Sequence, residues 1–275
     1  MTTTDFNHRH QRYADPETLQ VSLIIPARDG SASLNTTVRE AYAFLSKHYP
    51  NSFEIILVPN NSVPNNSPLL KDPTQQVAEQ LAASIPEVQV IPHLPPLPPG
   101  KGAALRTGFL ASRGKWIFFT DADLPYDLEF FCRAADHLQS GTDLVTGNRR
   151  LAESHFNIPV DLLKLAYRRH CLGLAYNRLV RCFLPIRTTD TQAGIKAFSR
   201  RLATQAFERQ ICPGFLFDLE VFLTAMGFGY RQVELPVTLY LNSEKSTVRI
   251  VRECAMVAIW LTRITWKYLR KGYKN

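Results

Sequence analysis

The sequence predicts an α/β fold built on an open, mostly parallel β-sheet that is flanked by helices. Short apolar runs rich in β-branched and aromatic residues alternate along the chain with longer stretches of helical periodicity. Such alternation is typical of βαβ units on a parallel sheet. The chain has 275 residues and 45% hydrophobic content. This is enough to bury one substantial core, so we expect a single main domain with short appendages.

Five apolar runs are the predicted strands of this sheet: Val21–Pro26, Phe53–Val58, Val88–Ile91, Trp116–Thr120 and Asp143–Thr146. Helical patterns open at Ser33 and at Gly102 in the gaps between them. Residues 60–73 are rich in Asn, Pro and Ser, and residues 93–99 hold four prolines, so both segments are predicted to be loops. Sheets of this kind bind ligands at the carboxyl ends of their strands, and we expect the two loops to lie over that edge.

The two ends of the chain differ in character from its centre. Residues 1–18 are polar without periodicity and lack an apolar stretch of the signal-peptide type, so they are predicted to be a flexible tail. The main domain is expected over residues 19–245. Residues 246–275 are predicted to form a basic amphipathic helix. No run of 18 apolar residues that could span a bilayer occurs in the sequence.

Charge and cysteine content narrow the class of partner and the compartment. The net charge of +8 and the pI near 9.3 favour acidic partners such as phosphates, anionic lipid or nucleic acid, without choosing among them. The five cysteines are odd in number and show no zinc-binding spacing. Buried free thiols in a reducing, cytosolic setting are the simplest interpretation.

Asp121 and Asp123 directly follow the apolar run WIFFT. Two carboxylates at i and i+2 after a buried strand can reach one hard cation, and Mg²⁺ or Mn²⁺ held in this way takes its other ligands from phosphate and water. A diphosphate leaving group needs such a cation. The same tripeptide is also common in ordinary turns, but its place at the end of a strand favours the metal.

Gly100, Lys101 and Gly102 open the helix that follows the proline-rich loop. Free N–H groups and a lysine at a helix start could receive a phosphate. The spacing does not match a Walker A loop, since Pro95 stands where its first glycine should be. An ordinary helix start remains the alternative.

Taken in order, VSLIIPARDG, EIILVPNNS, GKGAALRTGF, WIFFTDADLP, VTGNRR and DTQAGIKAF resemble glycosyltransferase family 2, and within it the dolichyl-phosphate glucosyltransferase and mannose synthase group. The resemblance covers residues 20–250 and implies a GT-A fold, a nucleotide-sugar donor and a divalent metal. It also implies roles for individual residues: Asp29, Asn60, Asn61 and Lys101 at the nucleotide, Asp121 and Asp123 at the metal, Arg149 at the sugar or phosphates, and Asp190, Gln192 and Lys196 on the acceptor side.

One departure from the family pattern concerns the nucleotide. Where the family usually has D-D-G-S, this chain has Asn60, Asn61 and Ser62. An amide can still bond to the edge of a base but carries no charge. The preference for a nucleotide, and with it activity, therefore depends on what these amides do.

Two basic stretches are candidate membrane contacts. Within residues 161–184, Arg168 and Arg169 interrupt an apolar stretch; the resemblance favours a pair of helices against the bilayer, with either arginine at a lipid phosphate, while a core helix with solvated arginines is the alternative. At about 100° per residue, the C-terminal helix has one apolar and one basic face. The basic face holds Arg249, Arg252, Arg263, Lys267 and Arg270, bordered by Trp260 and Trp266.

The expected function is inverting transfer of a hexose from UDP-glucose or GDP-mannose to a polyprenyl or dolichyl phosphate, by a peripheral enzyme on the cytoplasmic face of a membrane with an anionic surface. A phosphate acceptor is already an anion and needs no general base. A saccharide or small-molecule acceptor would need one, with Asp190, Asp218 or Glu220 as candidates. A non-catalytic RNA- or membrane-binding protein on a decayed transferase fold is the rival, although no RNA-binding signature of the RRM type is present and no nucleic-acid partner is expected.

Overall fold

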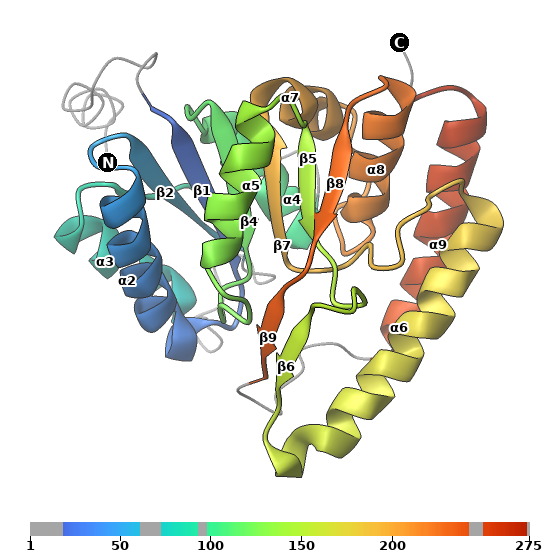
Figure 1. Cartoon of the computed structure of the whole chain (residues 1–275), viewed down its shortest axis with the longest axis horizontal. Helices are drawn as coiled ribbons and strands as arrows, with labels where there is room; N and C mark the ends of the chain where they lie inside the picture. Colours follow the sequence, from blue (N-terminus) through green and yellow to red (C-terminus); the bar gives the residue numbers. More distant parts are fainter. Residues whose placement is uncertain (1–18, 61–72, 93–97, 242–249, 274–275) are drawn as a thin grey trace.

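The computed structural model of the chain describes residues 19–60, 73–92, 98–241 and 250–273, without the side chains of residues 250–255. The tail expected at residues 1–18, Asn61 and the side chains of Arg249 and Arg252 lie outside the described residues. The main sheet has seven strands in the order β3-β2-β1-β4-β7-β5-β8 (Figure 1). Its strands are β1 (Val21–Ala27), β2 (Phe53–Pro59), β3 (Val88–Val90), β4 (Trp116–Thr120), β5 (Leu144–Gly147), β7 (Ile195–Ser199) and β8 (Gln232–Leu235).

The five strands that the sequence predicts are confirmed as β1 to β5. β2 and β4 are buried along their whole length, because helices cover both faces of the sheet. Their sequences are accordingly almost continuous apolar runs. Successive side chains point to opposite faces. On β1, Leu23 and Ile25 enter one core and Ile24 enters the other.

β7 is a strand that the sequence did not predict, because its residues follow the turn-rich segment DTQAG. It pairs antiparallel with both β4 and β5, whereas the other pairings in the main sheet are parallel. Its first residue, Ile195, pairs with Thr120, the last residue of β4. The segment before β7 therefore comes to the edge of the sheet at which Asp121 and Asp123 follow β4.

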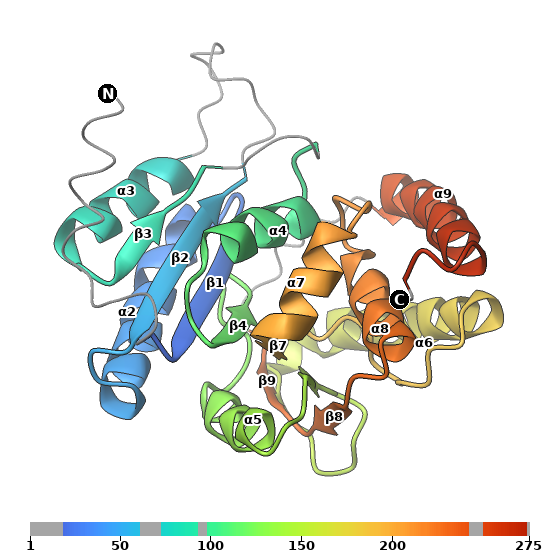
Figure 2. The same ribbon diagram turned by 90° about the horizontal axis from the view of Figure 1, so that it is seen from above.

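Helices cover the two faces of the sheet. α2 (Ser31–His48), α3 (Thr74–Ser84) and α5 (Glu129–Gln139) contribute to the core on one face, and α4 (Lys101–Ala111), α7 (Arg200–Glu208) and α8 (Phe217–Gly227) to the core on the other. Figure 2 shows α2 and α5 on one side of the strands and α4 and α7 on the opposite side. The fold class is thus the one expected, an α/β fold with a mostly parallel sheet.

Residues 161–184 form one helix rather than the pair that we expected. A 3-10 turn, η2 (Val160–Leu162), leads directly into α6 (Leu163–Phe183), which runs unbroken because no proline lies within it. A small second sheet of β6 (His155–Asn157) and β9 (Thr238–Tyr240) lies near its start (Figure 1). Within the described part of the chain, no helix has both the length and the apolar character needed to cross a membrane.

The C-terminal helix α9 (Ile250–Leu269) packs beside α6 and α8 (Figures 1 and 2). Leu261 and Ile264 are buried in this contact, as the periodicity predicts. The prediction that Lys267 belongs to the exposed basic face is wrong. Its ammonium donates to the carbonyl of Arg209 and lies 3.6 Å from a carboxylate oxygen of Glu220. The helix rotation that buries Leu261 and Ile264 carries Lys267 inward, so it cannot serve as a free surface charge.

Candidate active site

The candidate active site lies at the carboxyl ends of the parallel strands. Asp29 comes after β1, Asn60 directly after β2 and Asp121 directly after β4, so the topology brings these three side chains to one edge of the sheet. This is the edge at which open α/β sheets bind their ligands. The antiparallel direction of β7 adds the segment 190–194 to the same edge.

Lys101 and Asp121 form a direct ion pair in the middle of this edge. The ammonium of Lys101 lies 2.6 Å from Oδ1 of Asp121, and both side chains are mostly shielded from solvent. The rings of Phe119 and Phe215 lie 5.1 and 5.9 Å from the same ammonium, within the range for a cation–π contact. Burial alone would lower the pKa of Lys101, but the neighbouring carboxylates of Asp121 and Asp218 raise it above its usual value, so the lysine stays charged.

The two glycines beside Lys101 are explained by packing rather than by a phosphate. A Cβ on Gly100 would lie 2.2 Å from the carbonyl oxygen of Pro213, and one on Gly102 would lie 2.7 Å from Cβ of Phe217. The N–H of Ala103 donates to the same Pro213 carbonyl. The start of α4 is therefore closed by the segment before α8, and the part of the predicted phosphate site that remains is the ammonium of Lys101.

Asp123 lies two residues beyond Asp121 at the solvent-exposed border of the site. Partial desolvation and the negative charge of Asp121 raise the pKa of Asp123. The positive charges of Lys101 and Arg169 act to lower it. Two neighbouring carboxylates that disfavour each other's charge are stabilised by a cation between or beside them. Because both offer oxygen donors only, this pair fits a hard dication of the Mg²⁺ or Mn²⁺ type.

Gly194 packs directly against the carboxylate of Asp121. A Cβ at this position would lie 1.9 Å from Oδ2 of Asp121, so only glycine leaves room for that carboxylate. The N–H of Gly194 donates to the hydroxyl of Tyr126, a buried residue in the loop between β4 and α5. Neither residue was singled out in the sequence, since their role depends on the pairing of β7 with β4.

Gly194→Ala is expected to displace the Asp121 carboxylate and to lower turnover by on the order of 10²-fold, the usual cost of misplacing a reacting group by about 1 Å. The thermal unfolding midpoint should change little. Gly214→Ala is the matched control, because a Cβ there meets no atom within 4 Å. Steady-state turnover by the Gly194 variant equal to that of the Gly214 variant would contradict this role.

Arg149 and Asp190 form a two-point ion pair at the same edge of the sheet. Nε and Nη2 of Arg149 each donate to one carboxylate oxygen of Asp190 at 2.7 Å, and the backbone N–H of Arg149 donates to the same group. Burial alone would raise the pKa of Asp190, but the hydrogen bonds and charge of Arg149 hold it below its usual value. The geometry therefore brings together two residues that the resemblance assigned to the reaction, with Asp190 orienting Arg149.

Lys196, which was expected to bind substrate, is buried. Its side chain is 1% exposed, its ammonium lies 2.8 Å from Oδ1 of Asp218, and it donates to the carbonyl of Ala193. This buried pair sits beneath the segment 190–194 and holds it against α8. Gln192 lies half-buried within that segment, between Asp190 and Gly194.

Asp29 and Asn60, the residues expected at the nucleotide, follow β1 and β2 at this edge. Asp29 adopts the left-handed region with φ of 51°, a conformation that aspartate tolerates better than most residues, and its side chain is exposed. The N–H of Asn60 donates to the carbonyl of Ala27, which fixes its backbone beside the end of β1. Its side-chain oxygen is buried and has no hydrogen-bond partner among the described residues, so it remains able to accept one.

α6 separates the two arginines for which the sequence offered equal roles. Arg168 faces solvent, whereas Arg169 is half-buried and close enough to Asp123 for its charge to lower the pKa of that carboxyl. The structure thus places Arg169 at the site and Arg168 on the outer surface. Arg150 packs against the same helix, with its Nη2 3.3 Å from where a Cβ of Gly173 would be.

Glu220, one of the candidate bases, is removed from the site. Its carboxylate accepts from the backbone N–H groups of Ile211 and Cys212 and from the hydroxyl of Tyr273. It therefore joins α8 to the end of the chain. Its position in the sequence, two residues after Asp218, gave no indication of this role.

Comparison with known proteins gives one family. The model described as Glycosyl transferase family 2 matches residues 22–204. A dolichyl-phosphate beta-glucosyltransferase of Saccharomyces cerevisiae is 28% identical over 96% of this chain and 79% of its own length. One from Dictyostelium discoideum is 26% identical over 92% of this chain and 76% of its own length.

Solved structures share the fold. Glucosyl-3-phosphoglycerate synthase from Mycobacterium tuberculosis, in complex with Mn²⁺, UDP-glucose and phosphoglyceric acid, superimposes with a TM-score of 0.56 at 15% identity, covering 100% of this chain and 85% of that one. Mannosyl-3-phosphoglycerate synthase from Rubrobacter xylanophilus gives a TM-score of 0.57 at 19% identity, over 100% of this chain and 80% of that one. At these identities the likeness establishes the fold alone.

Proposed function

The chain belongs to glycosyltransferase family 2, and from this premise we propose that it transfers a hexose, with inversion, from a nucleotide sugar to a polyprenyl or dolichyl phosphate at a membrane surface. The two relatives named dolichyl-phosphate beta-glucosyltransferase align with most of this chain. Their names favour glucose as the sugar, and UDP-glucose over GDP-mannose as the donor.

The observation that carries the proposal is that each candidate base is already engaged. Both carboxylate oxygens of Asp190 bind Arg149, Asp218 is buried against Lys196, and Glu220 binds backbone and Tyr273. A hydroxyl acceptor needs a free base to take its proton. A phosphate monoester is already an anion near neutral pH and needs only to be positioned, which is the task these residues can perform.

The residues divide this task among them. Arg149, fixed by Asp190, and Lys101 provide positive charge for the phosphates, and Arg169 on α6 provides it on the Asp123 side of the site. A Mg²⁺ or Mn²⁺ ion held by Asp121 and Asp123 would supply charge stabilisation for the departing diphosphate. Attack by the acceptor oxygen on the anomeric carbon, as the bond to the diphosphate breaks, inverts the configuration of that carbon.

The test is a mass measurement of products from purified protein. UDP-glucose or GDP-mannose would be combined with Mg²⁺ or Mn²⁺ and with one of three acceptors: a short polyprenyl phosphate, phosphoglyceric acid or a saccharide. We expect hexosyl polyprenyl phosphate as the product. Transfer to either of the other acceptors, with none to the polyprenyl phosphate, would refute the lipid-phosphate assignment; RNA binding without any transfer would instead favour the non-catalytic alternative.

Asn60→Ala is expected to raise the KM for the nucleotide sugar roughly three- to tenfold, the value of one neutral hydrogen bond, while kcat stays nearly constant. The reason is that the free oxygen of Asn60 would bind the nucleoside equally in the ground state and the transition state. Initial rates across donor concentrations measure both constants. A KM equal to that of the parent for both nucleotide sugars would exclude Asn60 from donor binding.

Membrane attachment is the second part of the proposal, and α6 supplies its main surface. Val160 before α6, and Leu163 and Tyr167 in its first turns, are 83%, 50% and 70% exposed. Arg168, beside Tyr167, is also exposed. On α9, Arg263 and Arg270 stack on Trp260 and Trp266. Apolar and tryptophan side chains bordered by arginine suit the headgroup layer of an anionic, cytoplasmic leaflet.

The variant Val160→Ser with Tyr167→Ser is expected to lose sedimentation with anionic vesicles while turnover of a short, soluble polyprenyl phosphate survives. The apolar side chains would no longer be buried in lipid. In the parent, salt should also weaken binding, since each Lys or Arg near the surface contributes on the order of 1 kcal/mol. Leu110→Ser on α4, 49% exposed, is the control. Equal sedimentation of both variants would rule out α6 as the attachment surface.

A further inference from the structure

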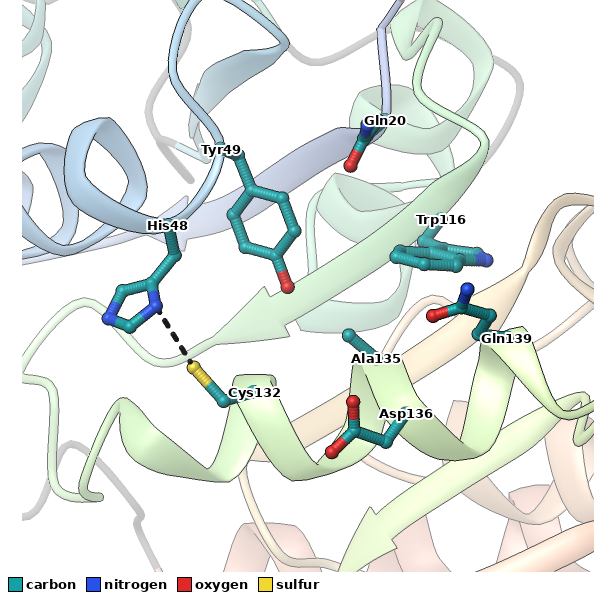
Figure 3. A pocket seen from close by; sticks show the side chains of 8 residues that line it. All are labelled: Gln20, His48, Tyr49, Trp116, Cys132, Ala135, Asp136 and Gln139. Atoms are coloured by element: carbon teal, nitrogen blue, oxygen red, sulfur yellow. Dashed lines mark hydrogen bonds between the residues drawn. The ribbon is translucent and has the colours of Figure 1, made fainter.

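A hollow lies between the C-terminal end of α2 and helix α5. Gln20 and Trp116 line it from the amino ends of β1 and β4, at the edge opposite the candidate active site. Figure 3 shows the side chains that line the hollow, and His48 and Cys132 point toward one another within it. The proposed transferase reaction uses none of them.

We propose that His48, Cys132 and Glu129 bind a transition-metal dication of the zinc type. Nδ1 of His48 lies 3.5 Å from Sγ of Cys132. One donor atom each from the histidine, the cysteine and the Glu129 carboxylate lies within 4.8 Å of the other two. Tetrahedral zinc with bonds of about 2.3 Å to sulfur and 2.0–2.1 Å to nitrogen holds these two ligands about 3.6 Å apart. The nitrogen and sulfur already have this separation.

Helix geometry explains how the three donors meet. Glu129 and Cys132 are three residues apart on α5 and therefore share one face, on which Asp136 follows one turn later. His48 is the last residue of α2, and its ring packs against Phe44 with ring centroids 4.5 Å apart. The C-terminal carbonyls of a helix also favour a cation at that end.

The donor set distinguishes this site from the one at Asp121 and Asp123. A thiolate, an imidazole and one carboxylate favour Zn²⁺ and related ions, whereas two carboxylates favour Mg²⁺ or Mn²⁺. On binding, the thiol proton of Cys132 leaves for solvent and the metal–sulfur bond forms in its place. Glu129 and Asp136 bring negative charge to the site, with Lys47 as the neighbouring basic residue in the chain.

A metal here would link two helices that both border the active-site loop. Ser33 and Thr37 of α2 donate to the carbonyl of Ala122, at 3.1 and 2.9 Å, and α5 follows the same loop along the chain. Joining the C-terminal end of α2 to α5 would stabilise the two helices that flank the loop of Asp121, Ala122 and Asp123. The proposed role is therefore structural.

The test is titration of the reduced, full-length protein with Co²⁺, which replaces zinc and gives a near-ultraviolet absorption band when bound to a thiolate. The parent should show this band, and Zn²⁺ but not Mg²⁺ should abolish it. Cys132→Ser should lack the band, whereas Cys171→Ser, at an exposed thiol on α6, should keep it. Asp123→Asn should also keep it, since the two metal sites are separate.

Glu129→Gln guards against loss of folding, because Glu129 is exposed and the change keeps its shape. It should weaken Co²⁺ binding by more than the roughly 10- to 100-fold that loss of an outer-shell partner typically causes. Circular dichroism of each variant without metal verifies the fold. A parent without the band, a band that survives Cys132→Ser, or a Glu129→Gln variant that binds Co²⁺ like the parent would overturn the proposal.

Discussion

Turnover of the Asp123→Asn variant is expected to fall by on the order of 10²- to 10³-fold, the equivalent of about 3–4 kcal/mol of transition-state stabilisation. The amide keeps the shape of the side chain but removes one of the two charges that would hold the metal at the leaving diphosphate. Asp123 lies at the border of the site and exposes its side chain, so the fold should persist. Initial rates at saturating donor, with a short polyprenyl phosphate as acceptor, measure the effect.

A chelator should reproduce this loss in the parent, and Mg²⁺ or Mn²⁺ should restore it. Glu40→Gln is the control, since Glu40 is an exposed carboxylate on α2, away from the sheet edge. Parent activity that is indifferent to the chelator, or an Asp123→Asn variant as active as the control, would exclude the metal role.

Asp190→Asn should lower both stability and activity, because it leaves the guanidinium of Arg149 without its carboxylate. Breaking a buried ion pair costs about 3–5 kcal/mol, and since the Arg149 side chain is 33% exposed we expect about 3 kcal/mol. For a domain of this size that corresponds to a drop of roughly 6 to 12 °C in Tm. Thermal unfolding of the variant against Glu40→Gln measures it; a drop no larger than that of the control would contradict the assignment.

The same pair makes a pH-dependent contribution to stability. Because the pKa of Asp190 is lowered in the folded state, its contribution is present above its unfolded value of about 3.9 and is lost as the pH falls through the folded value. The stability difference between the parent and Asp190→Asn should therefore be constant near neutral pH and shrink below about pH 4. Denaturant unfolding across this range tests the sign.

A double variant separates structure from function. Arg149→Met with Asp190→Leu removes both charges, so no buried ion is left unpaired and much of the stability should return. Activity should not return, since the guanidinium that would hold the phosphates is gone. Recovery of activity together with stability would show that Arg149 acts only in folding.

Most of the candidate residues that the resemblance named lie at one edge of the sheet, and the reason is local. Asp121 and Asp123 follow a strand whose apolar run is unmistakable, and Asn60 follows another. Because the carboxyl ends of parallel strands share one edge, the sequence was sufficient to bring these residues together. The turn-rich segment before β7 was the exception, since a short strand after turn residues has no periodicity of its own.

What the sequence by itself determined is therefore the first five strands, the mostly parallel sheet and the edge that carries the carboxylates. Tertiary structure alone decided the partner of each charged side chain. Lys196 and Lys267 look like surface or substrate lysines in the sequence, yet both turn inward to acidic residues of α8. Gly194 needs its missing Cβ only because β7 lies beside β4. Such contacts join residues far apart in the chain, and no local periodicity encodes which of them will meet.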